Sequence, residues 1–337
     1  MIGWLALAAA AGFIGWWSWE KSCRKTHPVA PGIQEDIDLA YEDEFELYHN
    51  ALSLCSMKTR VCMAELQIPY RGHAIDLIET GSYETLSREF LAVNPAGTVP
   101  VLVHRGHPIY ESHEQIRYAA AHAPPGSPSL VPADSALKEE MERWIDMSSL
   151  TDDPIRYPEK SIGNAVPRLT LQIFAAMIEK IPYRKILEGL LFHFDKRRPV
   201  LFLTLKARGL EGMHKLEPAM RMLAVGRKHV NAYLDELERQ LAKSGGPWIL
   251  GETFSLADVS WMVIFERLRQ VDNEHVFVGD GLRPACTVYW ERLRKRPSYA
   301  EAILGYPHPL IDHGIRRLKE VKAADPALRD ALEGISA

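Results

Sequence analysis

The residues best suited to chemistry lie in the stretch ALSLCSMKTR, residues 51–60. It places Ser53, Cys55 and Ser56 after an expected strand and at the start of an expected helix. The first turn of a helix carries partial positive charge, which favours a thiolate over a thiol at that position. Because a thiolate is a nucleophile, the stretch is a candidate for thiol chemistry. The alternative is that Ser53 is only a turn residue and Cys55 a small residue near a helix cap.

The surrounding pattern predicts a small layered α/β domain over residues 45–123. Residues 45–50 alternate as a strand does, and Ser56 is a plausible N-cap for a helix whose apolar residues share one face. The pair Asn94-Pro95 must end a later helix. Strands are expected at 45–50, 70–77, 98–106 and 107–112, and helices at 57–68, 82–93 and 113–121. The order βαβαββα follows.

Three motifs in this region resemble those of a known family. The segments LYHNALSLCSMKTRVCMAEL, NPAGTVPVL and IYESHEQIRYA occur in that order and spacing. Each motif alone is weak, but the ordered set is similar to the thioredoxin-like N-terminal domain of the cytosolic glutathione transferases. The resemblance implies glutathione as cosubstrate and a homodimer as the assembly.

The same resemblance assigns roles to individual residues. Pro100 corresponds to a cis-proline of the family, which directs the backbone of Val99 to the cysteinyl part of glutathione. Glu111 and Ser112 correspond to a pair that holds the γ-glutamyl end at a helix N-terminus. Without a ligand, Pro100 would be a turn residue, Ser112 an N-cap and Glu111 a solvated charge.

The stretch CSMKTR is similar to that of the tetrachlorohydroquinone reductive dehalogenases, near the zeta-like (maleylacetoacetate isomerase) branch. This likeness implies that Ser53 assists the glutathione thiolate. It implies that Cys55 resolves an aromatic glutathione conjugate by thiol exchange. Zeta-like isomerases also have a cysteine at that position, so a glutathione-dependent isomerase is a second reading. Cys62 is expected to be buried and inert.

The chain from residue 134 to residue 305 is expected to form an all-helical substrate domain. Asp134 or Ser135 caps its first helix, and the segment with Ser255 and Asp258 resembles the family's C-terminal signature, in which these two form a capping box. An insertion at about 151–212 resembles that of the ganglioside-induced differentiation-associated proteins. It could line a substrate pocket, rest on a membrane, form a subunit interface or add core. Residues 306–337 are expected as a charged tail with one helix.

Residues 2–19 contain no charged residue, and as a helix they would span roughly 27 Å, near the thickness of a bilayer core. Trp16, Trp17 and Trp19 end this run, as an interfacial aromatic belt would, and Lys21, Arg24 and Lys25 follow it. The pattern predicts a single transmembrane anchor with the later domains facing the cytoplasm, and a linker over residues 20–44. A secretory signal and a buried helix are the alternatives.

Composition excludes several other classes of function. A net charge of −4 without a basic stripe argues against nucleic acid as a partner. Four cysteines without a CxxC pair indicate neither a disulfide framework nor a zinc site, and no metal is expected. The sequence therefore predicts a membrane-tethered, glutathione-dependent enzyme acting on a hydrophobic or aromatic electrophile. A non-catalytic membrane adaptor with the transferase fold is the alternative.

Overall fold

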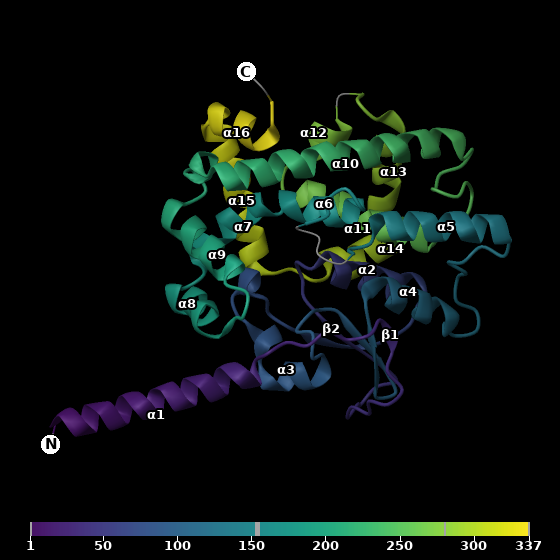
Figure 1. The fold of residues 1–337 in the computed structure, drawn as a ribbon. Helices are drawn as coiled ribbons and strands as arrows, with labels where there is room; N and C mark the ends of the chain where they lie inside the picture. The colour runs from purple at the N-terminus through teal and green to yellow at the C-terminus, as the bar shows by residue number, and fades with distance from the viewer. Residues whose placement is uncertain (1, 152–155, 280, 336–337) are drawn as a thin grey trace.

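A five-stranded sheet forms the centre of the first domain (Figure 1). The computed structural model describes residues 2–151, 156–279 and 281–335, so residues 152–155 of the expected insertion and 336–337 of the expected tail lie outside it. The strand order is β1-β5-β4-β2-β3; β2 pairs with β3 in parallel, and the other pairs are antiparallel. The strands are β1 Gly32–Ile33, β2 Phe45–His49, β3 Arg71–Ala74, β4 Val101–His104 and β5 His107–Tyr110.

Alternating side chains of the strands serve two separate cores, as the period of two in a strand requires. Leu47 and Leu102 point to the face covered by α2 and α4, whereas Val101 and Val103 pack with Phe90 on the other face. The helical elements of this domain are α2 Leu54–Glu65, η1 Ile78–Thr80, η2 Glu84–Leu86, α3 Arg88–Val93 and α4 Ser112–Ala121. The thioredoxin-like fold expected for this domain is confirmed.

The segment expected as a linker, residues 20–44, packs along this domain. Its strand β1 pairs with β5, and Val29 and Leu39 pack against the smaller of the two cores. The backbone N–H of His27 donates to Pro95 O at 2.8 Å. The strand within this predicted linker was not expected, because two residues are too short to show a period in the sequence.

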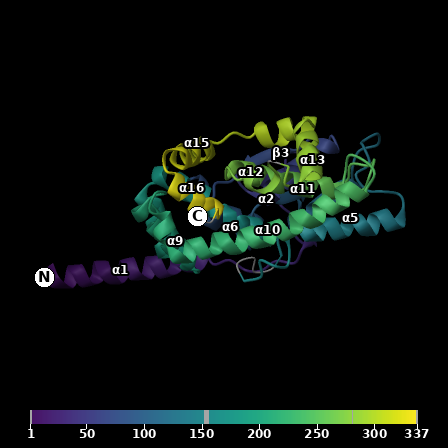
Figure 2. The ribbon, with the colours of Figure 1, turned by 90° about the horizontal axis from the view of Figure 1, so that it is seen from above.

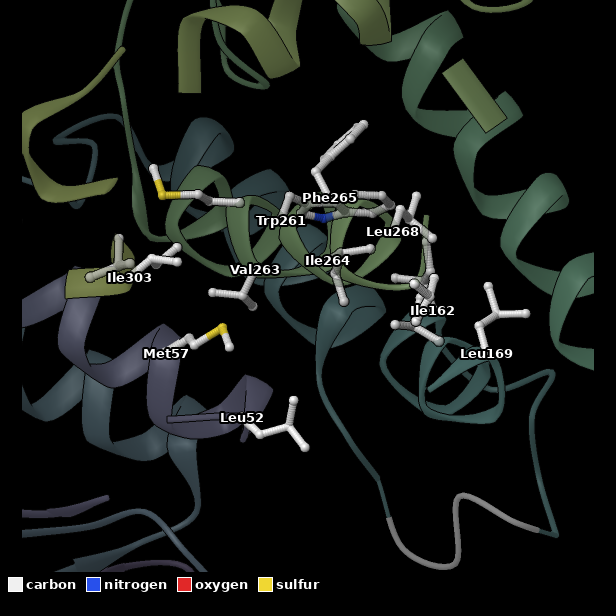
Figure 3. Packing of buried hydrophobic residues seen from close by; sticks show 14 of the residues in the cluster. Leu52, Met57, Ile162, Leu169, Trp261, Val263, Ile264, Phe265, Leu268 and Ile303 are labelled. Atoms are coloured by element: carbon white, nitrogen blue, oxygen red, sulfur yellow. The ribbon is translucent and has the colours of Figure 1, made fainter. Parts of the chain in front are cut away.

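The rest of the chain is helical around the central helix α11, which is buried along nearly its whole length. Figure 3 shows Met57 of α2 and Leu52 on the side of α11 from which Val263 and Ile264 project. The helices are α5 Ser135–Ser148, α6 Ile162–Leu169, α7 Leu171–Met177, η3 Ile178–Lys180, α8 Tyr183–Phe192, α9 Arg197–Arg208, η4 Met213–Lys215, α10 Glu217–Lys243, α11 Leu256–Gln270, α12 Glu274–Val278, α13 Pro284–Arg294, α14 Pro297–Tyr299, η5 Ala300–Leu304, α15 Pro309–Ala324 and α16 Pro326–Glu333. The expected all-helical domain is confirmed.

Both expected caps in this domain are present. Asp134 accepts a hydrogen bond from the backbone of Leu137, and Ser255 with Asp258 forms a capping box at the start of α11. Asp258 also accepts a hydrogen bond from the Tyr289 hydroxyl at 2.9 Å. The box thereby fixes the central helix against α13.

The insertion and the end of the chain pack on each other. α15 lies against α7, where Gly314 allows a close approach: a Cβ there would lie 2.5 Å from Met177 Cγ and 2.9 Å from Ile173 Cγ1. α16 contacts α10. The last residues therefore form two packed helices, not the single helix of a charged tail.

The helix expected near the N-terminus forms as α1 Ile2–Cys23 and projects from the body in both views (Figures 1 and 2). Its end is held on the body, because Arg24 pairs with Glu20 at 2.7 Å and with Glu188 at 2.8 Å. The transmembrane anchor predicted for residues 2–19 is not supported. Among the described residues, no helix is both long enough and apolar enough to cross a membrane. Residues 8–12 are alanine and glycine, which supply little apolar surface.

Candidate functional site

The two predicted sulfur-handling residues lie at the start of α2. Ser53, not Ser56, is the N-cap: its backbone is extended, and its hydroxyl oxygen accepts a hydrogen bond from Ser56 N at 3.2 Å. Within the described residues the Ser53 hydroxyl donates to no group, so its proton is available to a ligand. Cys55 follows in the first helical turn and is half-buried. A ligand sulfur at this point would meet a hydroxyl, a thiol and the positive end of a helix.

The residues predicted to hold glutathione lie on two neighbouring segments. The Val99–Pro100 peptide bond is cis, and Pro100 is buried just before β4. Within the described residues the backbone of Val99 makes no hydrogen bond, which leaves one donor and one acceptor for an extended peptide. Ser112 is buried at the first position of α4, and its hydroxyl makes no hydrogen bond within the described part of the chain. Glu111 precedes it with φ 67°, which non-glycine residues rarely adopt.

Gln115 connects these segments and is absent from the predicted set. Its side-chain N–H groups donate to Pro100 O and Ile109 O, both at 2.9 Å, and its oxygen accepts from Thr59 Oγ1 at 2.8 Å. Gln115 is fully buried, so each of these bonds lies away from water. One side chain therefore links α2, α4 and the cis-proline segment. A glutamine on the buried face of the expected helix 113–121 was the only signal in the sequence.

The loop before Ser53 is fixed from both domains. The backbone N–H of Leu52 donates to Asn50 Oδ1 at 2.8 Å, and the carbonyl of Leu52 accepts from the Arg267 guanidinium on α11. Arg267 also donates to Thr170 Oγ1 at 3.3 Å, and burial lowers the pKa of its guanidinium to about 10. The helical domain thus holds the peptide bond that joins Leu52 to Ser53.

Lys58 is a buried lysine at the junction of α2, α4 and α5. Its ammonium donates to Ser149 Oγ at 3.5 Å, and burial lowers its pKa. His113 on α4 is half-buried, and its pKa is lowered by burial and by the charge of Lys58. Neither residue was predicted as part of the site.

Comparison with known proteins identifies the family. Two glutathione S-transferase sequence models match the chain, that of the N-terminal domain over residues 52–122 and that of the C-terminal domain over residues 205–307. The chain belongs to the glutathione transferase superfamily. Most of the insertion expected at 151–212 lies between the two matched regions of this transferase.

Two relatives illustrate the likeness of this transferase chain to curated proteins. A tetrachloro-p-hydroquinone reductive dehalogenase of Sphingobium chlorophenolicum is 24% identical over 262 residues, which cover 77% of this chain and 95% of that protein. The glutathione S-transferase TCHQD of Arabidopsis thaliana is 25% identical over 265 residues, covering 77% of this chain and 90% of that protein. The solved structure of a beta-etherase from Sphingobium sp. strain SYK-6 has the same fold. It superposes with a TM-score of 0.61 at 20% identity and covers 78% of this chain and 100% of its own.

Proposed function

We propose that this chain is a glutathione-dependent enzyme that acts on a hydrophobic or aromatic electrophile by reductive thiol exchange. The observation that carries the proposal is the Gln115 network. It joins the helix start with Ser53 and Cys55 to the cis-proline segment and to the start of α4. The reductive dehalogenase among the relatives supports the reaction type.

Glutathione would bind as an extended peptide beside Val99, whose backbone donor and acceptor are unused within the described residues. Its γ-glutamyl carboxylate would meet the Ser112 hydroxyl and the N–H groups at the start of α4. Glu111 is exposed and would accept the ammonium. The sulfur would then lie toward Ser53 and Cys55.

The reaction has three balanced steps. Glutathione thiolate, stabilised by the Ser53 hydroxyl, displaces the leaving group from carbon and forms a thioether. The Cys55 thiolate attacks the sulfur of that thioether, so that an S–S bond forms, the C–S bond breaks, and the carbon takes the electron pair and a proton. A second glutathione thiolate attacks the mixed disulfide, releasing glutathione disulfide and the Cys55 thiolate. The substrate gains hydrogen in place of its leaving group, and two glutathiones are oxidised.

A calorimetric titration of glutathione into the full chain tests the binding half of the proposal. We expect saturable binding that Ser112→Ala weakens, because the variant loses a donor to the γ-glutamyl carboxylate. Glu84→Ala, an exposed change on η2, is the control and should bind as the parent does. Absence of binding at millimolar glutathione would overturn the proposal of a glutathione-dependent enzyme and support the alternative of a non-catalytic adaptor.

Cys55→Ser tests the reductive half. With a chlorinated hydroquinone as probe, the variant should stop at the glutathione conjugate, identified by mass spectrometry, because serine cannot exchange with a thioether sulfur. Normal release of reduced product by Cys55→Ser would remove Cys55 from the mechanism. Turnover that consumes no glutathione and yields an isomer of the substrate would favour the zeta-like isomerase.

A further inference from the structure

Asn50 follows β2 directly and shapes the turn that leads to Ser53 and Cys55. Its side chain is 3% exposed, and its Oδ1 accepts a hydrogen bond from Leu52 N at 2.8 Å, which is the pattern of an Asx turn. The backbone N–H of Asn50 donates to Ser56 Oγ at 3.1 Å. Ser56 N in turn donates to the hydroxyl of Ser53 at 3.2 Å. Hydrogen bonds from Asn50 therefore reach both sides of Ser53.

The other end of the Asn50 amide binds the segment that contains η1. Nδ2 donates to Ile75 O at 2.8 Å and to Thr80 Oγ1 at 2.9 Å. Because Leu52 N can only donate and Ile75 O can only accept, the network determines which end of the amide faces each partner. Thr80 is 3% exposed, so its bond to Nδ2 lies away from water. Residues beside η1 and within it therefore fix the direction in which Oδ1 points.

Two helices of the insertion contact η1 and the residues after it. Glu79 of η1 is 4% exposed and forms an ion pair with Arg198 of α9. α8 approaches closely at Gly189, where a Cβ would lie 2.1 Å from Tyr83 Oη. Glu79 is the neighbour in sequence of Thr80, which binds the Asn50 amide. The insertion thus holds the short helix on which the Asn50 side chain depends.

We propose that Asn50 is a positioning residue for the turn of residues 50–56 and that α8 and α9 set its orientation through η1. Its side chain holds the backbone that places the Ser53 hydroxyl and the Cys55 thiol at the start of α2. Asn50 acts through these two residues and touches no reacting atom. The proposal deepens the proposed function and rests on it for the reaction, but the hydrogen bonds form without glutathione.

Amide hydrogen exchange in the full chain tests the positioning without a ligand. Thr80→Val removes the oxygen that accepts from Asn50 Nδ2 and keeps the size of the side chain. We expect the peptide covering residues 51–57 to exchange faster by about threefold or more, the effect of losing one hydrogen bond that holds the turn. Thr85→Val, at a buried threonine of η2, is the matched control and should leave the exchange of this peptide unchanged.

Kinetics with glutathione and a chlorinated hydroquinone give a second readout, which a loss of stability alone would not reproduce. Thr80→Val should lower kcat by about tenfold or more, because Ser53 and Cys55 lose their alignment with the sulfur. The Kd for glutathione should stay as in the parent, since Val99 and Ser112 keep their places. A variant that is merely less stable would lose bound glutathione and turnover together.

Glu79→Gln tests the part of the insertion. It breaks the ion pair with Arg198 and leaves no buried charge, because the Arg198 side chain is half exposed. We expect the same changes in exchange and in kcat as for Thr80→Val, by a smaller factor. In the double variant the two effects should be less than additive, since both act through the bond to Asn50. Glu89→Gln, at an exposed residue of α3, is the control and should behave as the parent does.

Asn50→Ala should show the largest changes, and Thr80→Val, which removes a smaller set of contacts, decides if Asn50→Ala does not fold. Unchanged exchange of peptide 51–57 and unchanged kcat in Thr80→Val would overturn the positioning role. An effect in Thr80→Val without one in Glu79→Gln would overturn the part given to the insertion. Failure of the parent to bind glutathione would overturn the proposed enzyme, whereas faster exchange in Thr80→Val would still support the role of Asn50 in the turn.

Discussion

The side-chain amide of Gln115 lies 2.9 Å from the carbonyl oxygen of Pro100 and donates a hydrogen bond to it. The same amide binds Ile109 O, and its oxygen accepts from Thr59. The candidate site is therefore held together by a buried side chain that itself touches no ligand in the proposed arrangement. Such a residue contributes both to the stability of the fold and to the alignment of the segments proposed to bind glutathione.

Gln115→Leu removes all three of these hydrogen bonds and leaves buried partners unsatisfied. We expect the free energy of unfolding to fall by about 2–4 kcal/mol, and glutathione affinity to fall with it. Urea denaturation and calorimetry measure the two effects. Thr59→Val removes the bond to Gln115 and the longer one to Cys55 O at 3.2 Å, keeps the two bonds that the Gln115 amide donates, and should cost about 1 kcal/mol. Equal losses in the two variants would show that the bonds to Pro100 and Ile109 contribute nothing.

Ser53→Ala removes both a helix cap and the proposed donor to the glutathione sulfur. Ser87, the N-cap of α3, accepts from Phe90 N at 3.1 Å and supplies a matched control. Each alanine variant should lose about 1 kcal/mol of stability through the cap. Only Ser53→Ala should also lower kcat, by about a hundredfold, because it loses the hydroxyl that stabilises the thiolate. Full turnover in Ser53→Ala would exclude Ser53 as the activator.

His49 should make the fold sensitive to acid. It is buried at the end of β2, where its Nδ1 lies 3.2 Å from Arg60 Nη1, and burial followed by the charge of Arg60 lowers its pKa from 6.5 to about 3. Below pH 6.5 the unfolded chain binds a proton at this residue that the folded chain does not. Stability therefore falls as the pH falls from about 6.5 to about 3, at up to about 1.4 kcal/mol per pH unit.

Urea denaturation at several pH values measures this dependence. His49→Gln keeps an acceptor for Arg60 and should reduce the loss of unfolding free energy between pH 6.5 and pH 3. His27→Gln, at an exposed histidine, should leave the profile as it is. If the stability of both variants falls with pH as steeply as that of the parent, a group other than His49 causes the loss of stability in acid.

Gly314→Ala should disrupt the contact between α15 and α7. The added Cβ would lie 2.5 Å from Met177 Cγ, so the insertion must shift to accept it. We expect a loss of about 1–3 kcal/mol in the free energy of unfolding, as for overpacked cores. Gly12→Ala in α1 meets no atom within 4 Å and should be neutral or slightly stabilising. Similar thermal midpoints for parent and Gly314→Ala would contradict the close packing.

The order of strands and helices could be predicted because local rules and the fold agree. Alternation in Phe45–His49, the stop at Asn94-Pro95 and the Ser255–Asp258 box each act within a few residues. The cap of α2 was misplaced by three residues, since Ser53 and Ser56 are both good caps. The sequence also indicated helix over residues 2–19 correctly, but the anchor inferred from it is not supported.

The supporting residues of the site could not be predicted, because their partners lie far away in the sequence. Arg267 binds the carbonyl of Leu52, 215 positions earlier, and Lys58 binds Ser149, 91 positions later. No periodicity or short motif encodes such pairs. They become visible only once α11 and α5 are packed against α2.

The packing of α15 on α7 has a consequence for how the chain is made. α7 leaves the ribosome well before α15, which carries Gly314. Until then the α7 face that receives Gly314, including Ile173 and Met177, has no partner from α15. Since chains fold as they are synthesised, this region completes its packing only after α15 has emerged. A protein shortened before α15 would keep an apolar helix uncovered and become a substrate for chaperones and proteases.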